Sequence, residues 1–390
     1  MSEKVKHILS CLEVETSKKC IMTSRRQLDW ERSSIVEYDD DEKKVFAKKP
    51  GETHPPGQTQ DCLDNAKRWQ SYNVQREIES PLRYFLDGSR RTYKIADVPI
   101  GNRLFPLIAG QVGVGVCKRE RKRVRPYGQF KMHNVLAVPS GLDINGKDAA
   151  HNFAFFNKLR QSINAHNPRL ILDEIMGYTA SLTDNAEDRA IMLIQDYMMM
   201  REKAMVRQLV SDRQLSDESW LVKDGSLEYS KVDESDPLHY TRVKDNYKHV
   251  IGVSKSFNPE LMQLKGNKSA SRMLAELPPY HRTPAFRYIS GMADGEFAIW
   301  YVRIRPLQTV NHSPFDGIVK IEKLLIDKDE LQFGLESSQI DDISAWIINE
   351  RNPVCYGKDS RWANHIYPVY LTESYVKSKY MSTACFTHLF

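Results

Sequence analysis

The sequence predicts an α/β fold in which helices flank a mixed sheet. Apolar segments of strand length alternate with helical segments from about residue 84 onward. Acidic residues directly follow two of these apolar segments, where the strands of such a sheet would end. The chain has 390 residues, 41% of them hydrophobic and 27% charged, so it is long enough to bury a large core.

The expected elements follow in chain order. Apolar runs rich in β-branched and aromatic residues predict strands at 83–88, 104–118, 134–139, 219–227, 248–257, 297–305 and 317–326. Apolar residues at helical spacing predict helices at 186–210, near 340–350 and after Pro368. Gly113 and Gly115 indicate a strand with a close backbone approach, because the third glycine and the following helix of a nucleotide-binding loop are missing.

The first 80 residues differ in composition from the rest, and we expect residues 1–80 to form an appended arm with helices and a linker. In order, the arm holds an amphipathic helix, an acidic run, a breaker-rich linker and a second helix, at residues 3–19, 37–44, 49–60 and 61–78. Residues 81–390 are expected to form one domain. Within that domain, residues 117–183 resemble an insertion relative to a compact core.

Cysteine usage and hydropathy predict a cytoplasmic location. The six cysteines are scattered and form no Cys-x-x-Cys pair, which favours free thiols in a reducing compartment. No apolar run approaches the ~20 residues that a membrane span needs. The amino terminus also lacks the apolar core of a signal peptide.

The net charge of +5 is modest, but its distribution is uneven. Residues 118–125 read KRERKRVR, with six basic residues in eight, among them Lys118, Arg119 and Arg121. Such a run is typical of a solvated loop or strand end. It is equally compatible with a patch that contacts nucleic-acid phosphates without reading base sequence.

Two aspartates occupy matching positions. Asp87 in YFLDGS and Asp224 in WLVKDGSL each follow an apolar strand and precede Gly-Ser. Either motif alone is ordinary turn chemistry. Together they indicate acids at the ends of two strands, which lie ~5 Å apart if the strands are neighbours and can then share a divalent cation.

The long helix adds a third acid. Glu202 lies on the apolar stripe of residues 186–210, four residues after Met198 and three before Met205. A carboxylate on such a face is costly unless it is paired or binds a metal. A buried salt bridge to Arg201, Arg207 or another arginine is the alternative interpretation.

Three hard oxygen ligands without a cysteine or histidine cluster favour Mn²⁺ or Mg²⁺ over Zn²⁺. Metals in such sites activate water and stabilise the charge that develops on a phosphodiester. Arg90 and Arg91 follow Asp87 closely and are candidates to clamp a phosphate across the Gly-Ser turn. Lys255 is a further candidate phosphate contact, with an ordinary solvated lysine as the alternative.

The segments YFLDGSRR (84–91), WLVKDGSL (220–227) and VIGVSKS (250–256), with a helical glutamate between the first two, resemble the NurA nucleases. The resemblance covers roughly residues 81–380 and implies an RNase H-like fold. It also implies that Asp87, Glu202 and Asp224 are metal-binding catalytic acids.

The activity that the resemblance implies is a manganese-dependent DNA nuclease, with 5′-to-3′ exonuclease and single-strand endonuclease action. Members of this family usually form a homodimer that docks on a hexameric HerA-type ATPase, which feeds DNA into the nuclease. DNA end processing and defence against foreign DNA are both compatible with this activity.

The carboxy terminus departs from the family pattern, in which a Tyr-Pro pair precedes a helix bearing an Ala-His pair. Tyr367 and Pro368 are present, but Thr372 and Glu373 stand where the histidine is expected. Glu373 is a candidate replacement as metal ligand or base. His365 is a candidate to reach the site from before the turn.

Two other functions remain open at this level. The missing histidine is compatible with a catalytically silent subunit that binds DNA or couples to the translocase. An RNA nuclease or a transposase-like enzyme is also compatible, since RNase H-like acids serve many substrates. No single-strand RNA module is recognisable in the sequence.

Overall fold

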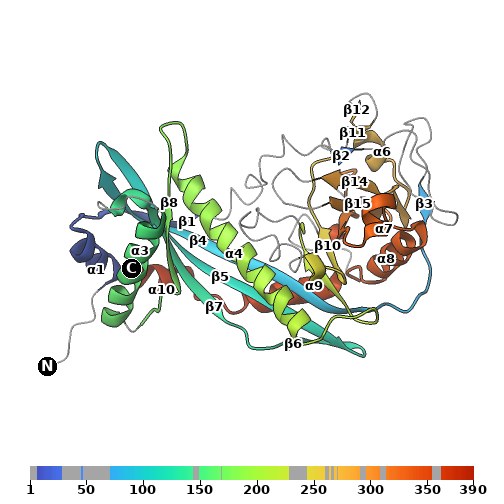
Figure 1. Ribbon diagram of the computed structural model, residues 1–390, viewed down its shortest axis with the longest axis horizontal. Helices are drawn as coiled ribbons and strands as arrows, with labels where there is room; N and C mark the ends of the chain where they lie inside the picture. Colours follow the sequence, from blue (N-terminus) through green and yellow to red (C-terminus); the bar gives the residue numbers. More distant parts are fainter. Residues whose placement is uncertain are drawn as a thin grey trace.

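A computed structural model describes residues 7–28, 45–46, 71–143, 149–167, 169–227, 244–259, 263–264, 268–269, 271–289, 296–307, 313–353 and 362–390. It is an elongated α/β structure built on a mixed, largely antiparallel sheet with helices on both faces (Figure 1). Two long strands, β4 (Leu82–Ile100) and β5 (Arg103–Glu120), run through most of its length.

The main sheet has the strand order β2-β14-β15-β16-β10-β9-β4-β5-β7-β8. The other strands on this path are β2 (Val45–Phe46), β14 (Phe286–Ile289), β15 (Glu296–Arg303), β16 (Ile318–Leu324), β10 (Val250–Ser254), β9 (Trp220–Asp224), β7 (Met132–Pro139) and β8 (Glu174–Tyr178). The central strands β10, β9 and β4 are parallel to one another. On either side, β5 is antiparallel to β4 and β7, and β16 is antiparallel to β10 and β15.

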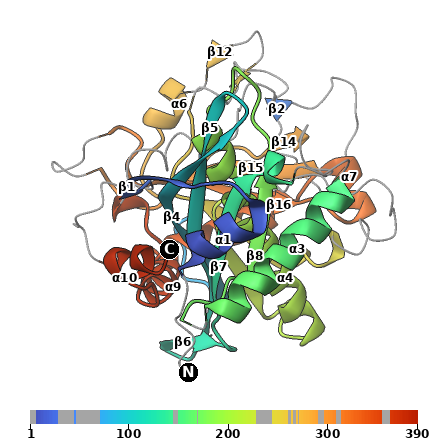
Figure 2. The same cartoon turned by 90° about the vertical axis from the view of Figure 1, so that its left-hand side faces the viewer.

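Helices cover both faces of the sheet, as the end-on view shows (Figure 2). On one face lie α3 (Ala149–His166) and α4 (Ala186–Ser211); on the other lie α9 (Tyr367–Lys377) and α10 (Thr383–His388). The helix α8 (Ser337–Asn349) packs beside β15, and α6 (Ser271–Ala275) and α7 (Lys328–Phe333) are short. None of the helices in the described part of the chain is long and apolar enough to cross a membrane.

Most elements predicted for residues 81–390 are confirmed. The predicted helix at 186–210 is α4, which begins where the Asn185 side chain accepts a hydrogen bond from the Glu187 amide at 3.0 Å. Pro368 lies in the first turn of α9, where its missing N–H costs no hydrogen bond.

The close backbone approach predicted at Gly113 and Gly115 is also confirmed. Both lie in β5 beneath α9, and a Cβ added to them would come within 2.9 and 2.6 Å of Val376. Glycine at these two positions therefore allows α9 to lie directly on the sheet.

The boundary drawn at residue 80 does not mark a structural division. The helix α1 (Ile8–Thr16) is shorter than predicted but packs its apolar side into a core shared with β4, β7 and α3. The strand β1 (Ile21–Gln27) pairs with the far half of β4. The described start of the chain is thus part of the main body, because its apolar face is buried there and not in an arm of its own.

The rest of the predicted arm is only partly described. Residues 37–44 and 49–60 lie outside the described residues, as do residues 61–70 of the predicted second helix. Its remaining part is not helical: β3 (Tyr72–Asn73) is a short strand that pairs with β13 (His281–Arg282). This part of the helix prediction is wrong, because pairing at a sheet edge overrides local helix propensity.

The segment 117–183, expected to be an insertion relative to a compact core, is paired into the main sheet. It contributes β6 (Arg123–Tyr127), β7, α3 and β8, and β7 pairs directly with β5 in the main sheet.

A second small sheet joins β11 (Gln263–Leu264) to β12 (Lys268–Ser269).

Candidate metal centre

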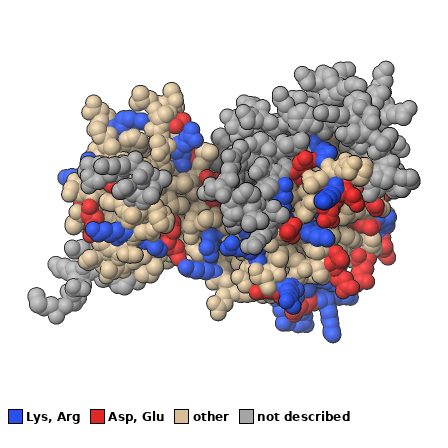
Figure 3. Space-filling model, viewed as in Figure 1, with Lys and Arg blue, Asp and Glu red and all other residues tan. Residues whose placement is uncertain are grey.

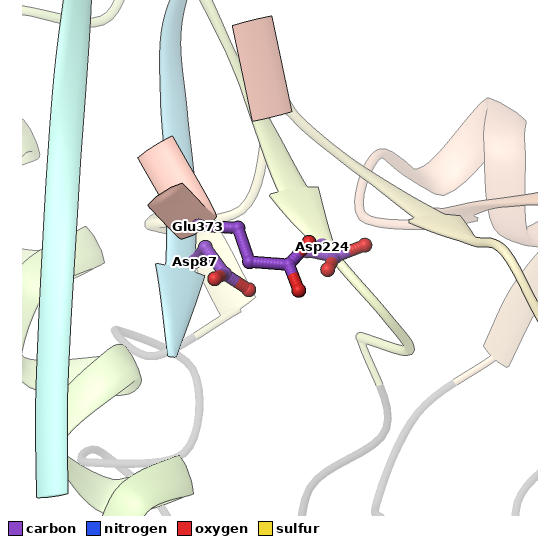
Figure 4. A group of neighbouring side chains, drawn as sticks. All are labelled: Asp87, Asp224 and Glu373. Atoms are coloured by element: carbon purple, nitrogen blue, oxygen red, sulfur yellow. The ribbon is translucent and has the colours of Figure 1, made fainter. Parts of the chain in front are cut away.

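Three acidic side chains converge beside the centre of the sheet. Asp87, Asp224 and Glu373 each offer a carboxylate oxygen, and these oxygens lie within 4.8 Å of one another. Figure 4 shows the three side chains pointing toward one another from β4, β9 and α9. Segments far apart in the sequence therefore form one acidic group.

The topology explains how the two aspartates meet. The strands β4 and β9 are parallel neighbours, with Leu86 in register with Lys223, so the next residue on each strand is an aspartate that points to the same face. The sequence comparison of the two motifs predicted this pair, and their proximity is confirmed.

The third acid, Glu373, comes from α9 above the same face. In β5, Gly115 is in register with Asp87 and lies against Val376, three residues after Glu373 on α9. The glycine lets the helix approach closely enough for Glu373 to reach the aspartates. This is the residue that stands in place of the histidine expected from the NurA pattern.

Asp87 is the most deeply buried of the three. It is 4% exposed, and its Oδ2 atom has no hydrogen-bond partner among the described residues. Burial, together with the neighbouring charges of Asp224 and Glu373, raises the pKa of Asp87 well above its ordinary value. A buried carboxylate oxygen without a partner is costly, and a bound cation would remove that cost.

Lys255 lies inside the acidic group. Its Nζ is 2.9 Å from Asp224 Oδ2 and 2.9 Å from Glu373 Oε2, and the residue is 8% exposed. Burial acts in the opposite direction, but Asp224, Glu373 and Asp87 raise the pKa of Lys255. The solvated-lysine interpretation is therefore wrong, and Lys255 is a buried ammonium paired with two acids.

Glu373 is held in its ionised form. Although burial opposes ionisation, Lys255 and Lys377 lower the pKa of Glu373 to about 2. The Lys377 Nζ donates to Glu373 Oε1 at 2.6 Å from one turn along α9. Both oxygens of Glu373 thus accept from lysines.

Glu202 does not join this group in the structure. It is buried against Gly88, where an added Cβ would lie 2.1 Å from Glu202 Oε1, and it ion-pairs with Lys223 at 2.8 Å. Successive residues of a strand point to opposite faces, so Glu202 lies on the α4 side of β4 and the Asp87 side chain on the α9 side. The place predicted for Glu202 in the acidic trio is taken by Glu373.

The alternative interpretation of Glu202, a buried salt bridge, matches what the structure shows, but with Lys223 instead of an arginine. Burial raises the pKa of Glu202 even so. The helical stripe predicted burial correctly, but it carried no signal for which partner would compensate the charge.

The turn after Asp224 is held by residues that no sequence motif marks. Gly225 has a φ of +82°, and the chain then folds back over Gly252. The buried Glu322 accepts from Ser226 Oγ at 2.8 Å and from the Leu227 amide at 2.7 Å. In the sequence, Glu322 could have been noticed only as an acidic residue within the apolar run at 317–326.

Lys223 holds the same turn from β9. Its Nζ donates to the carbonyl oxygens of Asp224 at 3.1 Å and Ser226 at 3.0 Å. Together with the Glu322 contacts, these bonds fix the backbone that carries the Asp224 carboxylate.

The predicted clamp of Arg90 and Arg91 on one phosphate is wrong, because β4 continues through Gly88 and Ser89 without a turn. Arg90 lies on the α4 side, where it donates to Gln195 Oε1 at 2.6 Å. Arg91 shares the face of Asp87, stacks on the Tyr380 ring at 4.4 Å and lies four residues, or about 13 Å, along the strand.

The basic run forms the end of the β5–β6 hairpin, and its members differ in environment. Lys118 lies over the Tyr84 ring at 5.4 Å, and Arg119 ion-pairs with Glu350 through both terminal nitrogens. Arg121 and the basic residues after it are exposed: Lys122, Arg123 and Arg125. Arg119 is thus engaged within the protein, whereas Arg121 is open to a ligand.

The remaining carboxy-terminal candidates lie outside the acidic group. His365 is buried just before α9, with its ring 5.4 Å from the Tyr370 ring. Tyr367 is the first residue of α9 and is 40% exposed. Glu373 and His365 were alternative candidates for the site. Of the two, Glu373 is the one that lies next to the aspartates.

No family model matches the chain, and no curated protein matches it.

The donor set fits a hard divalent cation. All ligand atoms of the acidic group are carboxylate oxygens, and one of them, Asp87 Oδ2, is buried without a hydrogen bond. Both Mg²⁺ and Mn²⁺, the cations expected from the sequence, suit a set of carboxylate oxygens. The acidic group can therefore hold one such cation.

Proposed function

We propose that the protein is a divalent-metal-dependent nuclease that hydrolyses DNA. One observation carries the proposal: the buried, unpartnered oxygen of Asp87 faces Asp224 and Glu373 within the reach of one cation. A structural core gains nothing from gathering three carboxylates around an unsatisfied oxygen, because each buried charge is costly unless it is compensated.

An RNase H-like fold is part of this proposal. The segment β7-β5-β4-β9-β10 supports it, since three hairpin-related antiparallel strands are followed by α4 and then by two strands parallel to the first. The acids stand on the central strand of that segment and on its parallel neighbour, as an RNase H-like nuclease requires.

In the proposed reaction Asp87, Asp224 and Glu373 would hold Mn²⁺ or Mg²⁺, which would activate water and stabilise charge on the phosphodiester. Other residues of the chain position these ligands. The turn held by Glu322 and Lys223 aims Asp224, and Lys255 places positive charge on the face where a phosphate would bind.

The exposed end of the β5–β6 hairpin supports nucleic acid as the substrate. Figure 3 shows Lys and Arg side chains, with some acidic ones among them, at the lower right of the molecule. Within the hairpin, Arg121, Lys122, Arg123 and Arg125 are exposed. A basic surface of this kind contacts phosphates without reading sequence. DNA as the polymer, a homodimer and a HerA-type ATPase partner are proposed from the resemblance to NurA nucleases.

The test is cleavage of labelled single- and double-stranded DNA with Mn²⁺, by the wild type and by Asp87→Asn. We expect the variant to lose activity by roughly 10³-fold or more, since it loses a metal ligand. Asp97→Asn is the matched control: Asp97 is also a buried aspartate of β4, but it ion-pairs with Lys94 at 3.1 Å, away from the acidic group.

DNA left intact by the wild type, alone and with a HerA-type ATPase, would contradict the proposal. Equal cleavage by wild type and Asp87→Asn would contradict the assignment of the site. The same assay with matched RNA oligonucleotides decides between DNA and RNA as the polymer.

The second candidate, a catalytically silent subunit, is favoured by one observation: a glutamate stands where the NurA pattern has histidine. Calorimetry with Mn²⁺ separates the two functions. A silent subunit would bind no more Mn²⁺ than the Asp87→Asn, Asp224→Asn double variant.

A further inference from the structure

We propose that Lys255 is a permanent cation of the acidic group, so that the chain binds one divalent ion there instead of two. The inference rests on the proposed function, because it concerns the same site. Beyond the proposed function, it states how many metal ions the acidic group binds.

The contacts of Lys255 are those of a bridging cation. Its Nζ lies 2.9 Å from an oxygen of Asp224 and 2.9 Å from an oxygen of Glu373. A metal ion shared by carboxylates from two elements would make the same bridge. The ammonium therefore ties α9 to the end of β9 in the way that a metal ion otherwise would.

Hydrogen bonds also fix the backbone of Lys255. Its carbonyl oxygen accepts from Asn364 Nδ2 at 2.8 Å, and Asn364 Oδ1 accepts from the Gly317 amide at 2.6 Å. Asn364 is itself buried. The backbone from which the lysine extends is thus anchored to two neighbouring segments, and the ammonium is built into the site.

The distribution of oxygens leaves room for one more cation. Glu373 accepts from Lys255 with Oε2 and from Lys377 with Oε1, and Asp224 Oδ2 faces Lys255. Asp87 forms no ion pair within the described part of the chain, and its Oδ2 has no hydrogen-bond partner there. Asp87 is therefore the acid of the group that is open to a metal ion.

The charges of the acidic group also favour one divalent ion. When a metal ion displaces the Asp87 proton, three carboxylates and one buried ammonium leave two negative charges, which one divalent ion neutralises. Lys377 adds little to this balance because it is 51% exposed and screened by solvent. A second divalent ion would stand beside the buried ammonium, where like charges repel strongly.

Two-metal nucleases place their ions ~4 Å apart, one for the attacking oxygen and one for the leaving oxygen. In this chain the Lys255 ammonium would supply the second positive charge to the phosphate. Lys255→Met keeps the length of the side chain and removes its charge, so it should open the second position to a metal ion.

The experiment is a calorimetric titration of the metal-free full-length protein with Mn²⁺, with electron paramagnetic resonance on the same samples. We expect the wild type to saturate at one ion per chain with an isolated Mn²⁺ signal. Lys255→Met should saturate at two ions and show the signal of a spin-coupled pair.

The matched control is Lys377→Met, which also removes a lysine from Glu373, but one that is half exposed. It should still saturate at one ion per chain. Thermal melting verifies that each variant is folded, and Lys255→Gln replaces Lys255→Met if the latter is not.

Two Mn²⁺ ions per wild-type chain would overturn the inference, as would a single ion in the folded Lys255 variants. If the wild type cuts DNA while binding two ions, only this inference fails. If it binds no Mn²⁺ and leaves DNA intact, the proposed function fails with it.

Discussion

The two Asp-Gly-Ser sequences of this chain have the same letters and different structures. At Asp87 the strand continues: Gly88 and Ser89 stay paired with Val114 and Gly113 of β5. After Asp224 the strand ends, and Gly225 adopts a φ of +82°. The difference lies in the neighbouring strand, because β5 pairs with β4 far beyond Asp87, whereas β9 pairs with β10 only up to Asp224.

The two glycines therefore serve different purposes. Gly88 makes room on the α4 side for the buried carboxylate of Glu202. Gly225 supplies a left-handed conformation that other residues rarely adopt. Asp87 consequently stands on a continuously paired strand and is deeply buried, whereas Asp224 stands at a turn whose backbone donates to Glu322 and accepts from Lys223.

The largest expected difference is in DNA cleavage when Asp87 or Asp224 is lengthened by one methylene group. Asp87→Glu should lower DNA cleavage by roughly 10³-fold, because a paired strand and α9 leave no space for the longer side chain. Asp224→Glu should lower it by only about 10-fold, since a turn can shift to accommodate it. Single-turnover cleavage with Mn²⁺ measures both, and equal losses would remove the contrast between strand and turn.

A smaller difference is expected for the glycines. Gly88→Ala should destabilise the fold by roughly 2–4 kcal/mol, because it displaces the buried Glu202–Lys223 pair. An added Cβ at Gly225 would meet only Lys223 Nζ, at 4.0 Å, so Gly225→Ala should cost about 1–2 kcal/mol, the strain of a left-handed alanine. Urea unfolding compares the two, with Gly225→Asn as a control that tolerates this conformation. A Gly88→Ala variant as stable as wild type would contradict the role given to Gly88.

The smallest expected effect is in the pH dependence of stability. Burial, with Asp224 and Glu373 nearby, raises the pKa of Asp87, so the folded protein holds this proton more tightly than the unfolded chain. Asp87 therefore favours folding below the ordinary aspartate pKa of roughly 4, and this contribution is lost as pH rises through the raised value.

Thermal melting in a chelating buffer tests this pH dependence. Asp87→Asn should show a smaller fall in melting temperature from pH 4 upward than wild type, and Asp97→Asn should fall as wild type does. Excess Mn²⁺ should reverse the fall in wild type, because the metal binds the ionised carboxylate. A wild-type curve identical to that of Asp87→Asn would show that the Asp87 proton does not matter.

Much of the secondary structure could be predicted, because it depends on local patterns. The apolar runs marked β5, β7, β15 and β16, and helical spacing marked α4 and α8. The predicted boundary at residue 80 rests on composition, which carries no information on which strands pair. Pairing of β1 with β4 and of β7 with β5 depends on contacts between segments far apart in the chain.

By itself, the sequence determined the strands that carry Asp87 and Asp224 and the match between their motifs. Only the tertiary structure decided that Glu373 joins them, that Glu202 pairs with Lys223 on the opposite face, and that Lys255 bridges two of the acids. The physical reason is that a local pattern predicts whether a residue is buried and on which face. The partner that compensates a buried charge depends on which strands and helices pack together.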